Sequence, residues 1–101
     1  MTARLPIERH DLAALCRRHG ISRLSLFGSV LKGTAGANSD IDLLVEFEPG
    51  AAPDLLEIAD IERELSALLH GRRVDLRTPE DLSRYFRDEV VREAEVQYES
   101  A

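Results

Sequence analysis

The amino-acid sequence predicts an α/β fold, in which a small mixed β-sheet carries helices packed mainly on one of its faces. Short apolar segments with the two-residue period of strands alternate along the chain with longer segments that have the period of amphipathic helices. Glycine, proline and asparagine residues separate these segments where turns are expected. The 101 residues suit one domain, which we expect to span residues 1–101.

The first half of the chain predicts one helix followed by two strands. The helix covers roughly residues 7–19 and ends at Gly20, a residue type that is common at helix C-termini. A strand follows at residues 21–27, and residues 30–33 could form one short helical turn. Residues 41–47, Ile-Asp-Leu-Leu-Val-Glu-Phe, form the strongest strand pattern. Apolar residues on both faces of this strand predict a central place in the sheet.

The second half predicts two helices with a strand between them. Asp54 is suited to cap the N-terminus of a helix that carries leucine and isoleucine at helical spacing and ends at Gly71. Residues 72–77 form a short strand. Thr78 and the proline after it begin a last helix, which we expect over residues 82–98 because apolar residues recur one turn apart.

Charge and cysteine content exclude several classes of protein. Thirteen Lys and Arg residues against 19 Asp and Glu residues give a net charge of −6 at pH 7. This balance disfavours nucleic-acid binding over the whole surface and leaves only a local basic patch open, and we expect no direct nucleic-acid binding. Cys16 is the single cysteine and cannot form an internal disulfide, which indicates a cytoplasmic protein. The apolar runs are too short for a membrane span or a secretory signal, so we expect no membrane association.

The residues that carry most chemical information are Gly28 and Ser29, followed after ten residues by Asp40 and Asp42. Residues two apart in a strand point to the same face, so the two aspartates are expected to project together. Adjacent carboxylates at the start of an apolar strand repel each other, which raises the free energy of the folded chain. A bound divalent cation such as Mg²⁺ would remove this repulsion. Asp75 adds a third acid on the strand that we expect beside them, and three carboxylates can hold two metal ions for phosphoryl transfer.

Gly28 and Ser29 suit the phosphates of a nucleoside triphosphate. A glycine lets a phosphate approach the backbone closely, and a serine hydroxyl with free N–H groups at the start of a helical turn attracts phosphate oxygens. The pattern is neither a Walker loop nor a dinucleotide fingerprint, because the remaining residues of both motifs are absent. The simpler alternatives are a plain turn at Ser29, a turn cap and a surface acid at Asp40 and Asp42, and a salt bridge from Asp75 to Arg72 or Arg77.

Together these residues resemble the signature of the DNA polymerase β-type nucleotidyltransferase superfamily. Gly28-Ser29 and the run Asp40-Ile41-Asp42-Leu43-Leu44-Val45 carry this resemblance. Val74-Asp75-Leu76, with Thr78-Pro79-Glu80-Asp81-Leu82 after it, resembles the minimal nucleotidyltransferase (MNT) branch. The resemblance covers the chain from Leu24 to Tyr98. Members of that branch are encoded as antitoxins beside HEPN-type ribonuclease toxins.

The resemblance implies a nucleotidyltransferase fold and a Mg²⁺-dependent transfer of AMP from ATP to a hydroxyl group. It also implies that the acceptor is a tyrosine of a cognate HEPN toxin, and that the modification neutralises the toxin. Two departures from the family pattern stand out. Lys32 replaces the usual arginine and could equally be a solvated lysine, and Arg77 falls where many relatives are apolar. By motif position, Gly28, Ser29 and Lys32 would bind the triphosphate, Asp40, Asp42 and Asp75 would hold two Mg²⁺ ions, and Asp75 would also act as the base.

Two other functions remain open from the sequence. A non-catalytic binding antitoxin keeps the fold and neutralises its toxin only by covering it. An adenylyltransferase that acts on a small molecule, as aminoglycoside adenylyltransferases do, needs a second domain over its substrate, beyond the single domain expected here.

The small size of the domain predicts that a second protein completes the site. The resemblance implies that this partner is the HEPN toxin, which could form an oligomer with this chain. We expect the partner surface to include the last helix, with Phe86, Val90, Val91 and Tyr98. Tyr85 and Tyr98 are expected to be packing or interface residues and not acceptors.

Overall fold

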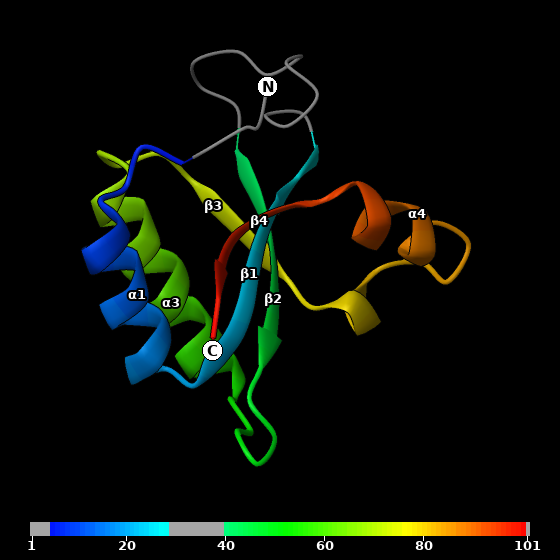
Figure 1. Cartoon of the computed structure of the whole chain (residues 1–101), viewed down its shortest axis with the longest axis horizontal. Coiled ribbons are helices and arrows are strands. Elements are labelled where there is room, and N and C mark those ends of the chain that lie inside the picture. Colours follow the sequence, from blue (N-terminus) through cyan, green and yellow to red (C-terminus); the bar gives the residue numbers. More distant parts are fainter. Residues whose placement is uncertain (1–4, 29–39, 101) are drawn as a thin grey trace.

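The computed structural model of the protein describes residues 5–28 and 40–100. Within these residues a four-stranded mixed sheet has the strand order β3-β2-β1-β4 (Figure 1). β1 (Ile21–Phe27) pairs antiparallel with β2 (Ile41–Phe47) and, on its other side, with β4 (Glu95–Glu99). β2 pairs parallel with β3 (Val74–Arg77). The predicted mixed sheet is confirmed, and the bounds of its first two strands agree with those expected from the sequence.

Two helices cover one face of this sheet. α1 (Arg9–Arg18) and α3 (Leu55–Leu68) lie side by side in Figure 1, and their apolar faces pack onto the sheet, as predicted. No helix among the described residues has the length and apolar character needed to cross a membrane. The core between the helices and the sheet contains Leu12, Leu15, Cys16, Ile21, Leu24, Leu26, Ile41, Leu43, Val45, Ile61, Leu65, Leu69 and Leu76.

β2 occupies the internal position that its apolar pattern predicts. It lies between β1 and β3, and the side chains of Leu43, Leu44 and Val45 are at most 2% exposed. Because successive residues of a strand point to opposite faces, Leu44 is buried on the face away from α1 and α3. A strand buried on both faces is a rigid support, and this one carries Asp42 near its beginning.

Polar side chains fix both ends of the α3–β3 segment. The Asp54 carboxylate accepts a hydrogen bond from the backbone N–H of Glu57 at 2.8 Å, so the predicted N-cap of α3 is confirmed. Further along the helix, Glu62 accepts a hydrogen bond from the N–H of Leu76 in β3 at 2.8 Å. α3 is thereby attached to the strand that carries Asp75.

The predicted helix over residues 82–98 is wrong. The chain instead forms a 3-10 turn, η1 (Pro79–Asp81), a short helix, α4 (Arg87–Glu93), and the strand β4. At Leu82 the backbone is extended, with ψ at 145°, so η1 does not continue into a helix. The Arg87 guanidinium donates to the carbonyl of Pro79 at 2.7 Å and holds η1 against α4.

The edge of β1 explains why the last segment is a strand. Glu95–Glu99 has the two-residue period of a strand, and β1 presents backbone N–H and C=O groups along the side that β2 does not use. Pairing with β1 satisfies these groups, which one more helical turn would leave unpaired. Tyr98 consequently packs against the hydrophobic core and does not lie on a helix surface.

Candidate active site

The strand register brings three of the predicted site residues to one place. Phe27 at the end of β1 pairs with Asp42, and Asp42 pairs on its other side with Asp75 of β3. Gly28 follows Phe27 directly in the sequence. Because neighbouring strands lie about 4.8 Å apart, the three strands place the backbone of Gly28 and the two carboxylates side by side. The expectation that Asp75 lies on the strand beside Asp42 is confirmed.

Gly28 lies against the side chain of Asp42. Its φ of +78° belongs to the left-handed region that favours glycine. A Cβ atom at this position would lie 2.9 Å from Cγ of Asp42, closer than Cβ atoms approach other atoms in proteins, and 3.0 Å from its Cβ, a tight contact. Glycine is therefore required here both for the backbone conformation and to leave space for the carboxylate. This second requirement was not anticipated from the sequence.

Arg77 forms an ion pair with Asp75. Its Nε donates to Oδ1 at 3.1 Å and its Nη2 to Oδ2 at 3.3 Å, so both carboxylate oxygens accept a hydrogen bond. The hydrogen bond and charge of Asp75 raise the pKa of Arg77, with smaller contributions from the charges of Asp81 and Asp42. The salt bridge considered for Asp75 on sequence grounds is thus present, and its partner is Arg77.

Of the other predicted site residues, the structure describes only Asp40. Asp40 comes directly before β2 and is exposed, whereas Ser29 and Lys32 lie outside the described residues, as does the turn expected at 30–33. Over residues 5–28 and 40–100, no group of three or more Asp, Glu, His or Cys side chains is arranged to hold a metal ion. The set of three carboxylate ligands therefore stays a prediction. The donor chemistry fits Mg²⁺, and the Asp42 carboxylate, one of these donors, occupies the space that the absent Cβ of Gly28 leaves.

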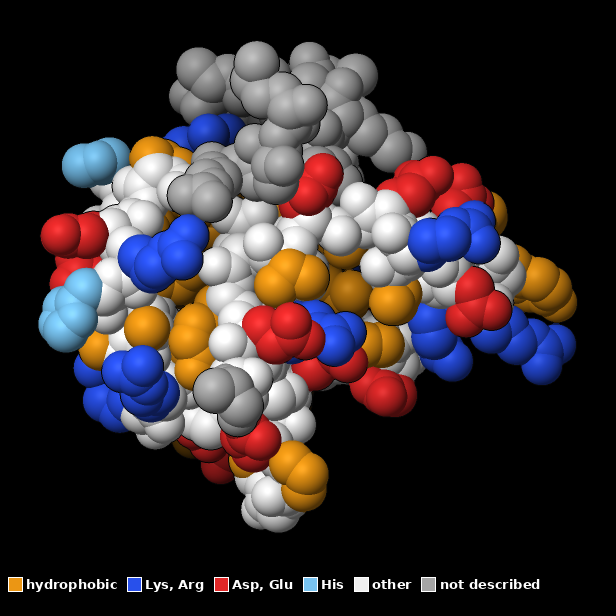
Figure 2. Space-filling model, in the orientation of Figure 1, with side chains coloured by type: hydrophobic (Ala, Val, Ile, Leu, Met, Phe, Trp, Pro, Cys, Tyr) orange, Lys and Arg blue, Asp and Glu red, His pale blue; other side chains and the backbone are white. Residues whose placement is uncertain are grey.

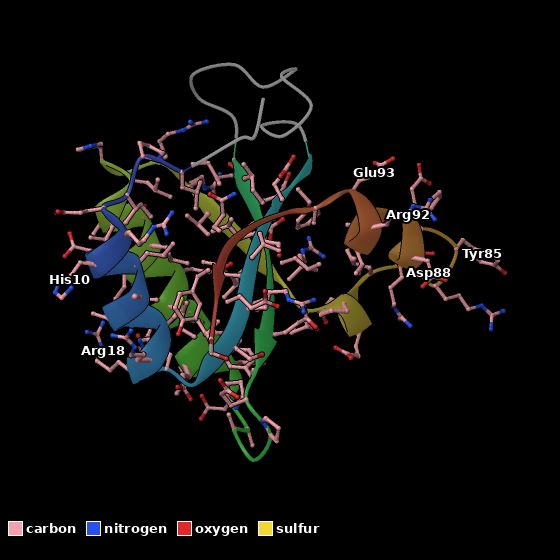
Figure 3. All side chains as sticks on the ribbon, in the orientation of Figure 1. His10, Arg18, Tyr85, Asp88, Arg92 and Glu93 are labelled. Atoms are coloured by element: carbon pink, nitrogen blue, oxygen red, sulfur yellow. The ribbon has the colours of Figure 1, made fainter. Side chains whose placement is uncertain are left out.

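Exposed apolar side chains gather on the segment from η1 to α4. Tyr85 is 79% exposed and Phe86 is 61% exposed, and the guanidinium of Arg84 lies over the Tyr85 ring, 5.3 Å from its centroid. Figure 3 shows Tyr85 at the side of the molecule opposite His10 and Arg18 of α1. In Figure 2 acidic, basic and hydrophobic side chains are mixed over this region.

Comparison with known proteins identifies relatives over most of the chain. Residues 12–97 match the protein family described as "Nucleotidyltransferase domain". The sequence is 40% identical over 79 residues to protein adenylyltransferase MntA of Thermococcus cleftensis. The aligned region covers 78% of this chain and 77% of that relative.

Solved structures with the same fold include one described as a minimal nucleotidyltransferase. It superposes with a TM-score of 0.69 and 44% identity, covering 85% of each chain. A toxin–antitoxin complex with AMP-PNP gives a TM-score of 0.71 at 24% identity, covering 93% of this chain and 75% of the other. A complex of a tri-AMPylated HEPN toxin with an MNT antitoxin from Shewanella oneidensis gives 0.60 at 20% identity, covering 91% and 70%. The nucleotidyltransferase fold implied by the sequence resemblance is confirmed.

Proposed function

Because this chain belongs to the nucleotidyltransferase family, we propose that it transfers AMP from ATP to a hydroxyl group of a HEPN-type toxin and so neutralises that toxin. The pairing of Asp42 with Asp75, beside the close approach of Gly28, is the observation that carries this proposal. Further support comes from the relative named a protein adenylyltransferase. Complexes with the same fold contain AMP-PNP or an AMPylated HEPN toxin.

In the proposed reaction, the acceptor oxygen attacks the α-phosphorus of ATP and forms a new phosphoester bond. The bond from the α-phosphorus to the bridging oxygen breaks, and pyrophosphate leaves. The proton of the hydroxyl group passes to a carboxylate oxygen of Asp75, which acts as the base. In the absence of metal, the hydrogen bonds from Arg77 hold this carboxylate in the half-exposed site.

Asp40, Asp42 and Asp75 are the proposed ligands of two Mg²⁺ ions, because carboxylate oxygens are the ligands that this ion prefers. Bound Mg²⁺ supplies positive charge that offsets the charge of the phosphate oxygens. Gly28 allows the triphosphate to approach the backbone, and we assign Ser29 and Lys32 to the triphosphate by their place in the motif.

The proposed contact surface for the toxin is the segment from η1 to α4. Exposed aromatic and apolar side chains are typical of the centres of protein interfaces, and this segment exposes Tyr85, Phe86 and Val91. The toxin would hold its acceptor hydroxyl, which we propose belongs to a tyrosine, in line with the α-phosphorus, and it would exclude water from the site. We place this reaction in the cytoplasm, consistent with the single thiol of Cys16.

The test combines the protein with its proposed HEPN-type partner, ATP and Mg²⁺, and measures the intact mass of the HEPN protein. We expect a gain of one or a few AMP units and a loss of ribonuclease activity. Asp42→Asn should abolish the gain, whereas Asp11→Asn, an exposed change on α1, should leave it unchanged. Peptide mapping identifies the acceptor.

Two results would contradict the proposal. Neutralisation without a mass change, by wild type and Asp42→Asn alike, would establish a binding-only antitoxin. AMP transfer to an aminoglycoside, with an unmodified HEPN protein, would establish a small-molecule adenylyltransferase.

A further inference from the structure

Arg77 has a role that the family resemblance does not explain. It ends β3, two residues after Asp75, so both side chains leave the strand on the same face. Its two hydrogen bonds to Asp75 give it the planar, two-point contact that a guanidinium makes with a carboxylate. The side chains of Arg77 and Asp75 are 48% and 36% exposed, so the pair lies at the rim of the site and is reachable from solvent.

The position of Asp75 makes this pair more than an ordinary surface salt bridge. Asp42 lies directly opposite Asp75 on the neighbouring parallel strand. Two carboxylates on adjacent strands repel each other, and β2 cannot move away because it is buried on both faces. Arg77 interacts electrostatically with both of them. It therefore supplies at this point the positive charge that a divalent cation would otherwise supply.

We propose that Arg77 is an internal counter-ion that compensates the Asp42–Asp75 pair in the absence of metal and competes with Mg²⁺ for the oxygens of Asp75. This inference rests on the proposed function, since it assumes that Asp75 is a metal ligand. Arg77 is a positioning residue in this scheme and does not touch ATP. It sets the concentration of Mg²⁺ at which the site fills, and it keeps the carboxylates from repelling each other before the metal arrives.

The test measures the affinity of the protein for Mn²⁺ alone, by the loss of the electron paramagnetic resonance signal of free Mn²⁺, with Mg²⁺ as competitor. Arg77→Met removes the charge and keeps an unbranched side chain that replaces the aliphatic stem of the arginine. It should tighten Mn²⁺ binding about 3- to 10-fold, the scale of a water-screened interaction between a single and a double charge. Arg77→Lys keeps the charge without the two-point contact and should lie between wild type and Arg77→Met.

Arg23→Met is the matched control. Arg23 lies in β1 of the same sheet, is similarly exposed, and pairs with Glu46 and Glu99 away from the aspartates. Its removal should leave Mn²⁺ affinity unchanged. Thermal unfolding provides a second measurement: in EDTA, Arg77→Met should unfold at a lower temperature than wild type, and added Mg²⁺ should restore more of its stability than it adds to wild type.

Two results separate this inference from the proposed function. Equal or weaker Mn²⁺ binding by Arg77→Met, with binding by wild type intact, would refute the counter-ion role alone. No specific Mn²⁺ binding by wild type and Arg77→Met alike would refute the metal site itself, and the counter-ion role with it. AMP transfer measured in parallel then shows whether the proposed reaction survives.

Discussion

Replacement of Gly28 by alanine should lower both the stability of the protein and its transfer activity. A left-handed conformation costs an alanine about 1–2 kcal/mol. The new Cβ would also lie 3.0 Å from Cβ of Asp42, a contact that rotation of the carboxylate does not relieve. Moving the Asp42 side chain off its rotamer adds about 1 kcal/mol. We therefore expect Gly28→Ala to reduce the free energy of unfolding by about 2–3 kcal/mol.

Gly50→Ala is a matched control for this change. Gly50 also has a positive φ, +92°, but a Cβ there would meet no atom within 4 Å. It should show only the conformational cost, so thermal unfolding should separate the two variants by about 4–8 °C, the shift expected for ~1 kcal/mol in a domain of about 100 residues. In the AMP-transfer assay Gly28→Ala should lose roughly 10²-fold, the effect of displacing a reacting group by about 1 Å, and Gly50→Ala should match wild type. Equal destabilisation of both variants, with full transfer by Gly28→Ala, would refute the close approach to Asp42.

Three further predictions concern the scaffold. Leu65→Ala removes a fully buried side chain of α3 and should lower the free energy of unfolding in urea by about 2–5 kcal/mol. Leu56 lies on the same helix but is 77% exposed, so Leu56→Ala should change stability by less than about 0.5 kcal/mol. Equal effects of the two changes would contradict the packing of α3. Asp54→Ala should lower stability by about 1 kcal/mol and Asp54→Asn by much less, because only the former removes the capping acceptor; a loss of equal size in both would argue against the cap. Burial raises the pKa of the Cys16 thiol to about 12, so the folded protein holds this proton more tightly than the unfolded chain does. Its contribution to stability is present below the unfolded pKa of 9.0 and is lost as pH rises through about 12. Iodoacetamide near pH ~8 should therefore modify Cys16 only after denaturant is added, and rapid modification of the native protein would overturn this.

Local sequence patterns predicted most of the sheet, because the alternation of apolar residues indicates a strand and the flanking turn residues indicate where it begins and ends. β1 and β2 each have an apolar run bounded by turn residues, and both have the expected limits. The last segment contains two competing periods. Phe86, Val90 and Ala94 recur at helical spacing, while Val96 and Tyr98 alternate as in a strand. The choice between them depends on the open edge of β1, a distant part of the chain that no local pattern reveals.

The candidate site was predicted in its residue types and only partly in its geometry. The acids could be found because Asp42 and Asp75 interrupt apolar strands, where a charge is unusual. The contact of Gly28 with Asp42 depends on the register of two antiparallel strands, which the sequence between them does not specify. Arg77 was recognised as a possible partner of Asp75, but its proximity to Asp42 follows only from the parallel pairing of β2 with β3.

The order of strands in the sheet also has a consequence for how the chain folds during synthesis on the ribosome. Leu24 of β1 pairs with Val45, 21 positions later, and on its other side with Tyr98, 74 positions later. At ~5–20 residues per second, the outer edge of β1 stays open for about 4–15 s after β1 is made. An open edge can pair with another nascent chain, and closing a long loop is slow. We therefore expect the domain to complete its fold only when Glu95–Glu99 has left the exit tunnel. Until then, aggregation of the nascent chain depends on whether another molecule, such as a chaperone, covers the open edge of β1.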